Sequence, residues 1–110
     1  MILTRQNERT WSDSGIAGVQ TCPTWTGNDG DGDGGYLAKF QAGARFPKHV
    51  HHGWEQIFVV AGAIRFNDVE MRPGDVLQVQ GSDMHEACAL EETLLFVAHH
   101  GGIDMLEQAQ

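Results

Sequence analysis

The fold and the chemistry of this chain are decided by residues 43–62, which read GARFPKHVHHGWEQIFVVAG. His49 and His51 lie two residues apart, and Glu55 follows four residues after the second histidine. Side chains at positions i and i+2 of an extended strand point to the same face. The two histidines can therefore aim at one point, which Glu55 can join after a short turn. Two imidazoles and a carboxylate make a divalent metal site of intermediate softness.

Length, composition and charge narrow the possible classes of protein. The chain has 110 residues, 41% hydrophobic and 20% charged, which fits a single globular domain over residues 1–110 with a small core. A formal net charge of -8 argues against nucleic acid or an anionic membrane as partner, since both require a basic face. The N-terminus has no apolar signal core, and the apolar run at 57–64 is too short to span a bilayer. We therefore expect a cytoplasmic protein.

Two cysteines, Cys22 and Cys88, are present and form no CxxC pair, so they make no zinc knuckle. A small secreted domain stapled by disulfides usually has more cysteines. We interpret both as small buried or half-buried thiols, and a disulfide between them remains the alternative.

The rest of the chain alternates short strand-like runs with turns rich in Gly, Pro and Asp. Strands are expected at 21–26, 36–41, 46–51, 55–61, 64–71 (a hairpin about Asn67-Asp68), 76–80, 84–90 and 93–99. Residues 1–20 predict an irregular arm with short strands. The only helix candidate is the tail, 104–110, which Asp104 could cap. Short strands at this spacing predict an all-β sandwich or barrel.

One loop carries half of a calcium-binding pattern. Residues 27–35 contain Asp29, Asp31 and Asp33 at the spacing of the first calcium ligands of a calcium loop. The twelfth position from Asp29 is Phe40, where a bidentate glutamate is needed. Two interpretations stay open: a calcium site, or a hairpin tip in which glycine supplies positive φ and aspartate stays solvated.

The glycines at both ends of the opening stretch complete a longer pattern, Gly43-x5-His49-x-His51-x3-Glu55-x6-Gly62. This pattern resembles the first sequence motif of the cupin superfamily (RmlC-like proteins) at every fixed position. The resemblance extends over about residues 36–98. It implies a small antiparallel double-stranded β-helix, also called a jelly-roll barrel.

The second cupin motif is matched in part. It begins at Gly74 and reaches His85 with the family spacing, while Gln80, Ser82 and Ala89 replace the proline, glycine and asparagine of the motif. The resemblance implies four metal ligands: His49, His51, Glu55 and His85. Strand alternation from His85 also places Ala87 and Ala89 toward the lumen of the barrel. We expect a divalent ion, such as Fe(II), Mn, Ni or Zn, with open positions for a ligand.

Three further residues are candidates for substrate binding. Trp54 sits in the ligand turn, where it could shield the metal or lie in an interface. Arg45 precedes His49 by an even count and could face the mouth and bind an anion, although Pro47 intervenes. One residue of the pair His99-His100 must share the inner parity of the last strand, and we take His99 as the candidate.

A closer resemblance is to the ChrR-type cupin-like domain of anti-sigma factors. It is carried by Trp11, Gly15-Ile-Ala-Gly-Val19, Pro47-x-His49-x-His51-x-Gly53-Trp-Glu55, Gly81-Ser-Asp-Met-His85 and Leu94-Leu-Phe-Val97. That domain forms the C-terminal half of factors that respond to singlet oxygen, and it also occurs alone. Gln56 stands where the family often has a second acidic residue. The sigma-contacting zinc domain is missing here, so an anti-sigma role for this chain alone is not expected.

Two main classes of function follow from these expectations, and the imperfect second motif keeps open a third, a vestigial cupin with a purely structural metal. The first is a metal-dependent small-molecule enzyme, such as an Fe(II) dioxygenase of diketone or enediol substrates. The second is a non-catalytic sensor or ligand-binding module of the ChrR type. In either class we expect a small-molecule partner and, on family grounds and for protection of edge strands, a homodimer.

Overall fold

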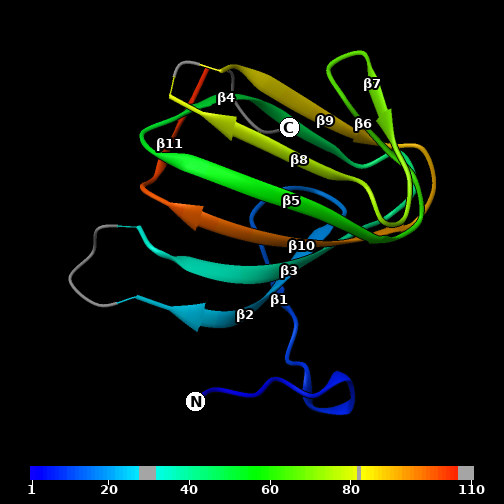
Figure 1. Ribbon diagram of the computed structural model, residues 1–110. Coiled ribbons are helices and arrows are strands. Elements are labelled where there is room, and N and C mark those ends of the chain that lie inside the picture. Colours follow the sequence, from blue (N-terminus) through cyan, green and yellow to red (C-terminus); the bar gives the residue numbers. More distant parts are fainter. Residues whose placement is uncertain (28–31, 82, 107–110) are drawn as a thin grey trace.

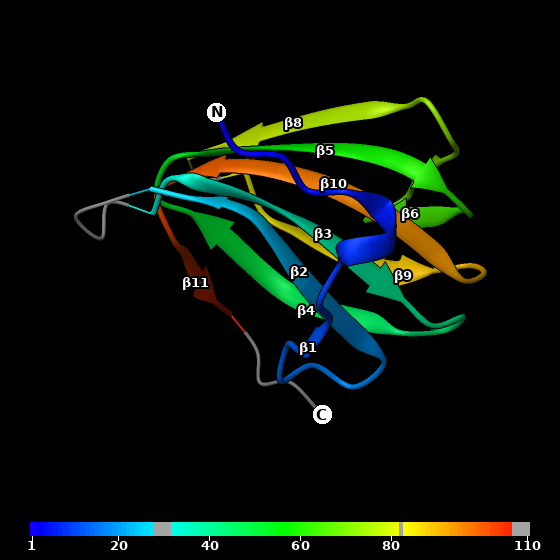
Figure 2. The ribbon, with the colours of Figure 1, turned by 90° about the horizontal axis from the view of Figure 1, so that it is seen from below.

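The computed structural model describes residues 1–27, 32–81 and 83–106. Its elements in chain order are η1 (Gln6–Glu8), β1 (Ser12–Asp13), β2 (Val19–Thr26), β3 (Gly34–Phe40), β4 (Arg45–His51), β5 (Trp54–Ala61), β6 (Ile64–Phe66), β7 (Val69–Met71), β8 (Val76–Gln80), β9 (His85–Ala89), β10 (Thr93–His100) and β11 (Ile103–Met105). Antiparallel pairing joins the strands into two sheets that face each other (Figures 1 and 2). The predicted all-β antiparallel fold is confirmed.

Residues 43–62 contribute one strand to each of the two sheets. The six-stranded sheet has the order β1-β2-β3-β10-β5-β8, and the five-stranded sheet has the order β11-β4-β9-β6-β7. Strand β4 therefore lies in one sheet and β5 in the other, with only His52 and Gly53 between them. This crossing places the two histidines and the glutamate of the stretch on opposite walls of one interior.

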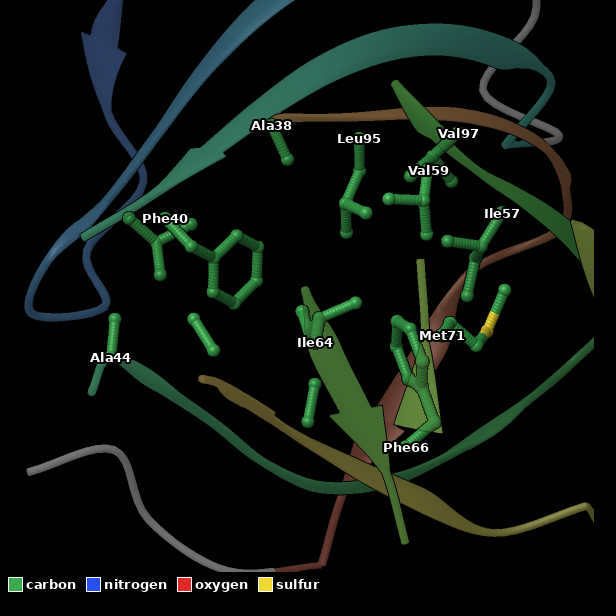
Figure 3. Close-up of a cluster of buried hydrophobic side chains, with 13 residues drawn as sticks. Ala38, Phe40, Ala44, Ile57, Val59, Ile64, Phe66, Met71, Leu95 and Val97 are labelled. Carbon is green, nitrogen blue, oxygen red and sulfur yellow. The ribbon is translucent and has the colours of Figure 1, made fainter. Parts of the chain in front are cut away.

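The hydrophobic core lies between the sheets and follows from strand alternation. On β5, Ile57 and Val59 are buried, whereas Phe58 and Val60 on the same strand are exposed. Ile64 and Phe66 of β6 face the core from the opposite sheet. Figure 3 shows these side chains meeting from both walls. Burial of such side chains is the main favourable term of folding.

Two turns around the core require unusual backbone conformations. Asn67, in the two-residue loop between β6 and β7, has a φ of 54°. Asparagine tolerates this left-handed conformation better than most residues, which fits a tight hairpin. Gly62 has a φ of 92°, and a Cβ there would lie 2.2 Å from the carbonyl oxygen of Glu92. The last glycine of the motif is therefore fixed by sterics.

The prediction of a helix from Asp104 is wrong for the described part of the tail. Residues 103–105 form β11, which pairs with β4 so that Ile103 lies opposite His51 and Met105 opposite His49. A helix of seven residues closes few hydrogen bonds, whereas the free edge of β4 offers a row of unpaired backbone groups. Tertiary pairing therefore decides the conformation of this segment. Residues 107–110 lie outside the described residues.

The N-terminal arm and the aspartate-rich loop complete the description. The arm holds η1 and the two-residue β1, which pairs with β2, in agreement with the prediction of short strands. Asp29 and Asp31 of the half calcium pattern lie outside the described residues, while Asp33 forms an ion pair with His100. Within the described part of the chain, no helix is long and apolar enough to cross a membrane.

Neighbouring valines on β5 test the importance of the core. Val59 is 0% exposed and Val60 is 41% exposed. We expect Val59→Ala to lower the free energy of unfolding by about 2 kcal/mol, because two buried carbon groups are lost and a cavity remains. Val60→Ala is the matched control and should change it by less than about 0.5 kcal/mol. Urea unfolding followed by tryptophan fluorescence measures both, and equal losses would contradict this assignment of the core.

Candidate metal centre

Four side chains from three strands converge between the sheets. His49 and His51 come from β4, Glu55 from the start of β5, and His85 from the start of β9. Strands β4 and β9 are paired with His49 directly opposite His85, which explains how a residue 36 positions from His49 reaches the same point. All four side chains are buried, and one donor atom from each lies within 4.8 Å of the others.

The distances among these groups are those of a compact cluster. The His49 and His85 ring centres lie 4.4 Å apart, and the ring centre of His51 lies 5.0 Å and 4.9 Å from them. Glu55 Oε1 lies 3.5 Å from His51 Nε2 and 3.8 Å from His85 Nε2. Donor atoms bound at about 2.1 Å to one ion lie at most about 4.2 Å apart, so a small adjustment brings this set onto an ion.

Hydrogen bonds orient two of the imidazoles. His49 Nδ1 lies 2.8 Å from the carbonyl oxygen of Pro47, so Nδ1–H donates there and Nε2 keeps its lone pair for the cluster. His51 Nδ1 lies 3.4 Å from the carbonyl oxygen of Asp83, a longer contact of the same kind. Hydrogen bonds of this kind fix the tautomer and the ring orientation of histidines that bind metals.

Burial and charge shift the pKa values of the three histidines in opposite directions. Desolvation lowers the pKa of His49, and desolvation together with repulsion from His49 lowers the pKa of His85 to about 4. The hydrogen-bonding and charge interaction with Glu55 raises the pKa of His51. His49 and His85 are therefore neutral near pH 7, which is the form that binds metal.

Buried polar atoms without a hydrogen-bond partner are a second reason why these residues fit a divalent ion. His51 Nε2 and His85 Nδ1 are buried and have no hydrogen-bond partner among the described residues. A buried polar atom without a partner costs about 1–3 kcal/mol, and the burial of a carboxylate costs more unless a counter-charge is present. An ion held by this group would take up the lone pair of His51 Nε2 and supply the counter-charge for Glu55.

A cavity of about 470 Å³ opens beside this cluster. Its wall near the cluster is formed by His49, His85 and Glu55, and the remaining wall is mainly apolar, with contributions from Ala38, Phe40, Phe46, Ile57, Phe66, Ala87, Leu95 and Val97. Ala87 and Ala89 are buried on the inner face of β9, as strand alternation predicted. An apolar cavity with a few converging polar groups is typical of a small-molecule site.

Arg45 is not brought to this cavity. It is exposed and pairs with Glu86 at 2.7 Å on the outside of the five-stranded sheet. The register of β4 against β9 shifts between Phe46 and His49, and such an irregularity breaks simple alternation. Phe46 consequently lines the cavity, whereas simple alternation from His49 would have turned Arg45 inward. The expectation that Arg45 faces the mouth is therefore corrected.

Trp54 and His99 take different positions. Trp54 is 39% exposed and stacks on His100 outside the cavity, because it immediately precedes the inward-facing Glu55. His99 lines the cavity, as its parity predicted, and lies opposite Glu55 in the pairing of β10 with β5. Its Nδ1 donates to the carbonyl oxygen of Gly32 at 2.6 Å, so in the neutral ring Nε2 is an acceptor.

Sequence reasoning missed two residues that the structure brings to the site. Tyr36 of β3 lines the cavity and packs its ring 5.6 Å from that of His99. Asn67 accepts a hydrogen bond from the backbone of Glu86 at 3.1 Å and donates one to the carbonyl of Met84 at 3.1 Å, so it holds the chain on both sides of His85. Inward parity along β3 was the available signal for Tyr36, whereas nothing in the sequence indicated the role of Asn67.

The fold and the family model of a cupin-like domain together define the class of this protein: it is a cupin with a buried three-histidine, one-glutamate group that could hold a metal ion. The model of the ChrR cupin-like domain matches residues 1–104. The chain therefore belongs to the ChrR cupin-like family.

Solved structures agree with this fold. An RmlC-like cupin from Ralstonia eutropha has a TM-score of 0.82 at 21% identity, with 94% of this chain and 71% of that chain covered. A chain in the crystal structure of Rhodobacter sphaeroides SigE in complex with the anti-sigma ChrR has a TM-score of 0.73 at 24% identity. The match covers 86% of this chain and 50% of that chain. A putative acetylacetone dioxygenase from Methylibium petroleiphilum has a TM-score of 0.84 at 12% identity, with 96% and 80% covered. No curated protein sequence matches the chain.

Replacing His85 by leucine tests how much the candidate ligand cluster lowers the free energy of unfolding when no ion is bound. His85 packs against Phe66 with ring centres 5.4 Å apart, and its Nδ1 has no partner in the described part of the chain. In chelator-treated protein we expect His85→Leu to raise the free energy of unfolding by about 1 kcal/mol, because a buried unsatisfied group is removed. His52→Leu, on the exposed neighbour of His51, is the control and should give no such gain. A less stable His85→Leu protein in urea unfolding would contradict the assignment.

Proposed function

We propose that this protein binds one divalent metal ion through His49, His51, Glu55 and His85 and acts on a small molecule in the adjoining cavity. The most specific form of the proposal is a metal-dependent oxidoreductase, such as an Fe(II) dioxygenase of diketone or enediol substrates. The observation that carries it is the convergence of four buried ligand groups on an apolar cavity of about 470 Å³. Mn, Ni and Zn are compatible with the same nitrogen and oxygen donors.

The roles of the residues follow from the positions already described. The three histidines and Glu55 would hold the ion, and four protein ligands on a six-coordinate ion leave two positions open. When bound, the ion supplies Lewis-acid or dioxygen chemistry. Phe46 and Phe66 exclude water from the cavity beside the ligands. Glu55 is the one carboxylate in the cluster, so it is our candidate to accept a proton from a substrate.

Metal content and oxygen uptake test this proposal together. We expect protein purified without added metal to carry about one divalent ion per chain, measured by inductively coupled plasma mass spectrometry. The Fe(II) form should consume oxygen with at least one member of a panel of β-diketones, enediols and hydroxyphenyl ketones. His49→Ala should abolish both metal and turnover, because one of four ligands is lost. His52→Ala is the control and should retain both, and protein without bound metal at neutral pH would refute the proposal.

A second candidate function is a metal-dependent sensor or ligand-binding module of the ChrR type. The family match over residues 1–104 favours it. The cavity itself offers no lysine or arginine among its described lining residues, so acid–base catalysis has few candidates besides Glu55, Tyr36 and the histidines. Tightly held zinc with no oxygen uptake across the panel would favour the sensor over the enzyme.

We further propose that two copies associate through the outer face of the six-stranded sheet. Phe96, Phe58 and Val76 lie in one row across β10, β5 and β8 on this face. Phe58 and Val76 are 39% and 61% exposed, and Val60 is also exposed on the same strand as Phe58. A contiguous exposed apolar patch of this kind marks an interaction surface.

Light scattering after gel filtration tests this association. We expect a mass of twice 12.1 kDa for the natural chain and 12.1 kDa for Val76→Glu, because a buried unpaired carboxylate in the interface is costly. Val69→Glu, on the exposed strand β7 of the other sheet, makes the same change elsewhere and should remain dimeric. A natural chain that elutes with the mass of one copy would refute the dimer.

A further inference from the structure

Tyr36 is the one tyrosine of the chain, and its place in the six-stranded sheet is fixed by register. It lies opposite Val97 of β10, two residues along that strand from His99, which itself lies opposite Glu55 of β5. Tyr36, Val97, His99 and Glu55 all contribute to the wall of the cavity. The phenol ring thus lies on the inner face of the sheet, one row away from the metal-site carboxylate.

The hydroxyl group of Tyr36 is a hydrogen-bond donor in need of an acceptor. No hydrogen bond joins it to any residue that the structure describes. Burial, followed by the charge of Glu55, raises the pKa of Tyr36, so the group remains protonated at neutral pH. Tyr36 is half-buried and lines the cavity, so its hydroxyl group can donate a hydrogen bond to a ligand or a water held there.

The electrostatics of the wall limit what that ligand can be. The described lining residues include no lysine or arginine but three acidic residues, Asp13, Asp33 and Glu55, of which Asp33 is paired with His100. A phosphate or second carboxylate placed away from the metal centre would therefore have no cation to pair with and would face like charges. The apolar side chains that form most of the remaining wall favour an alkyl or aryl body instead.

We propose that the Tyr36 hydroxyl donates a hydrogen bond to an oxygen atom of a ligand held at the metal centre, and that the cavity selects neutral or singly charged oxygen chelators with an apolar body. This inference rests on the proposed metal-binding function and names the substrate class of that same site. It makes Tyr36 a specificity-determining residue, supplied by a strand outside both sequence motifs. Alkyl and aryl diketones and hydroxyketones fit the class, whereas sugar phosphates and dicarboxylates do not.

The test uses the full chain loaded with Co(II), whose visible spectrum reports ligand binding at the metal. The probes are maltol, a neutral hydroxypyranone chelator, oxalate, a dianionic chelator, and imidazole, a ligand with no oxygen. Tyr36→Phe removes only the hydroxyl group. Thr21→Val is the matched control, because it removes another hydroxyl group from a residue that lines the same cavity. Thr21 of β2 lies opposite Ala38, which is two positions from Tyr36 on β3.

We expect Tyr36→Phe to bind cobalt as the natural chain does but to weaken maltol binding by about tenfold, the loss of one hydrogen bond to a charged oxygen. Imidazole affinity should be unchanged in Tyr36→Phe, and Thr21→Val should keep the affinity for maltol. The natural chain should bind maltol more tightly than oxalate.

Equal maltol affinity in Tyr36→Phe and the natural chain would overturn the role of Tyr36 while the metal proposal stands. Oxalate binding at least as tight as maltol binding would overturn the substrate class. A natural chain that binds no cobalt would overturn the metal proposal and this inference with it. Cobalt affinity, measured first in every variant, distinguishes these cases.

Discussion

Everything at the centre of this molecule depends on one constraint: the carboxylate of Glu55 is held, 8% exposed, between two apolar sheets. A carboxylate in such surroundings is stable only when positive charge or hydrogen-bond donors surround it. Here the nearest groups are the ring nitrogens of His51 and His85, 3.5 Å and 3.8 Å away. Burial keeps His85 neutral near pH 7, so among these two rings only His51, whose pKa Glu55 raises, can share the charge, whereas a divalent ion held by the group would compensate it.

The architecture is arranged so that this cluster exists only in the closed barrel. Glu55 belongs to the six-stranded sheet, while the three histidines belong to the five-stranded sheet. The turn of His52 and Gly53 joins the two walls, and a Cβ at Gly53 would lie 2.0 Å from the carbonyl oxygen of His100. Glycine is therefore required for the end of β10 to pack against the turn. The hydrogen bonds of Asn67 then hold the start of β9, and with it His85, against the neighbouring β6–β7 hairpin of the same sheet.

The sequence was sufficient for the parts of the site that depend on local geometry. Spacing alone predicted that His49, His51 and Glu55 converge, and alternation predicted that Ala87 and Ala89 of β9 face inward. His85 needed the family resemblance, because pairing between distant strands is not visible in local spacing. Arg45 was misplaced because the irregularity in β4 changes parity between Phe46 and His49. The tail was misjudged because the free edge of β4, a tertiary feature, overrides a weak local preference for helix.

The division between predictable and unpredictable residues has a physical origin that bears on function. The candidate metal ligands obey fixed spacing, as expected if one ion demands several donors at short distances. A cavity wall has no such demand, since many combinations of apolar side chains fill the same volume. In this chain part of the wall comes from Asp13 and Ser14 of the N-terminal arm, which precede both cupin motifs. Changes in this arm or at Tyr36 would therefore alter the small molecule that the cavity accepts, while the motif that identifies the family stays the same.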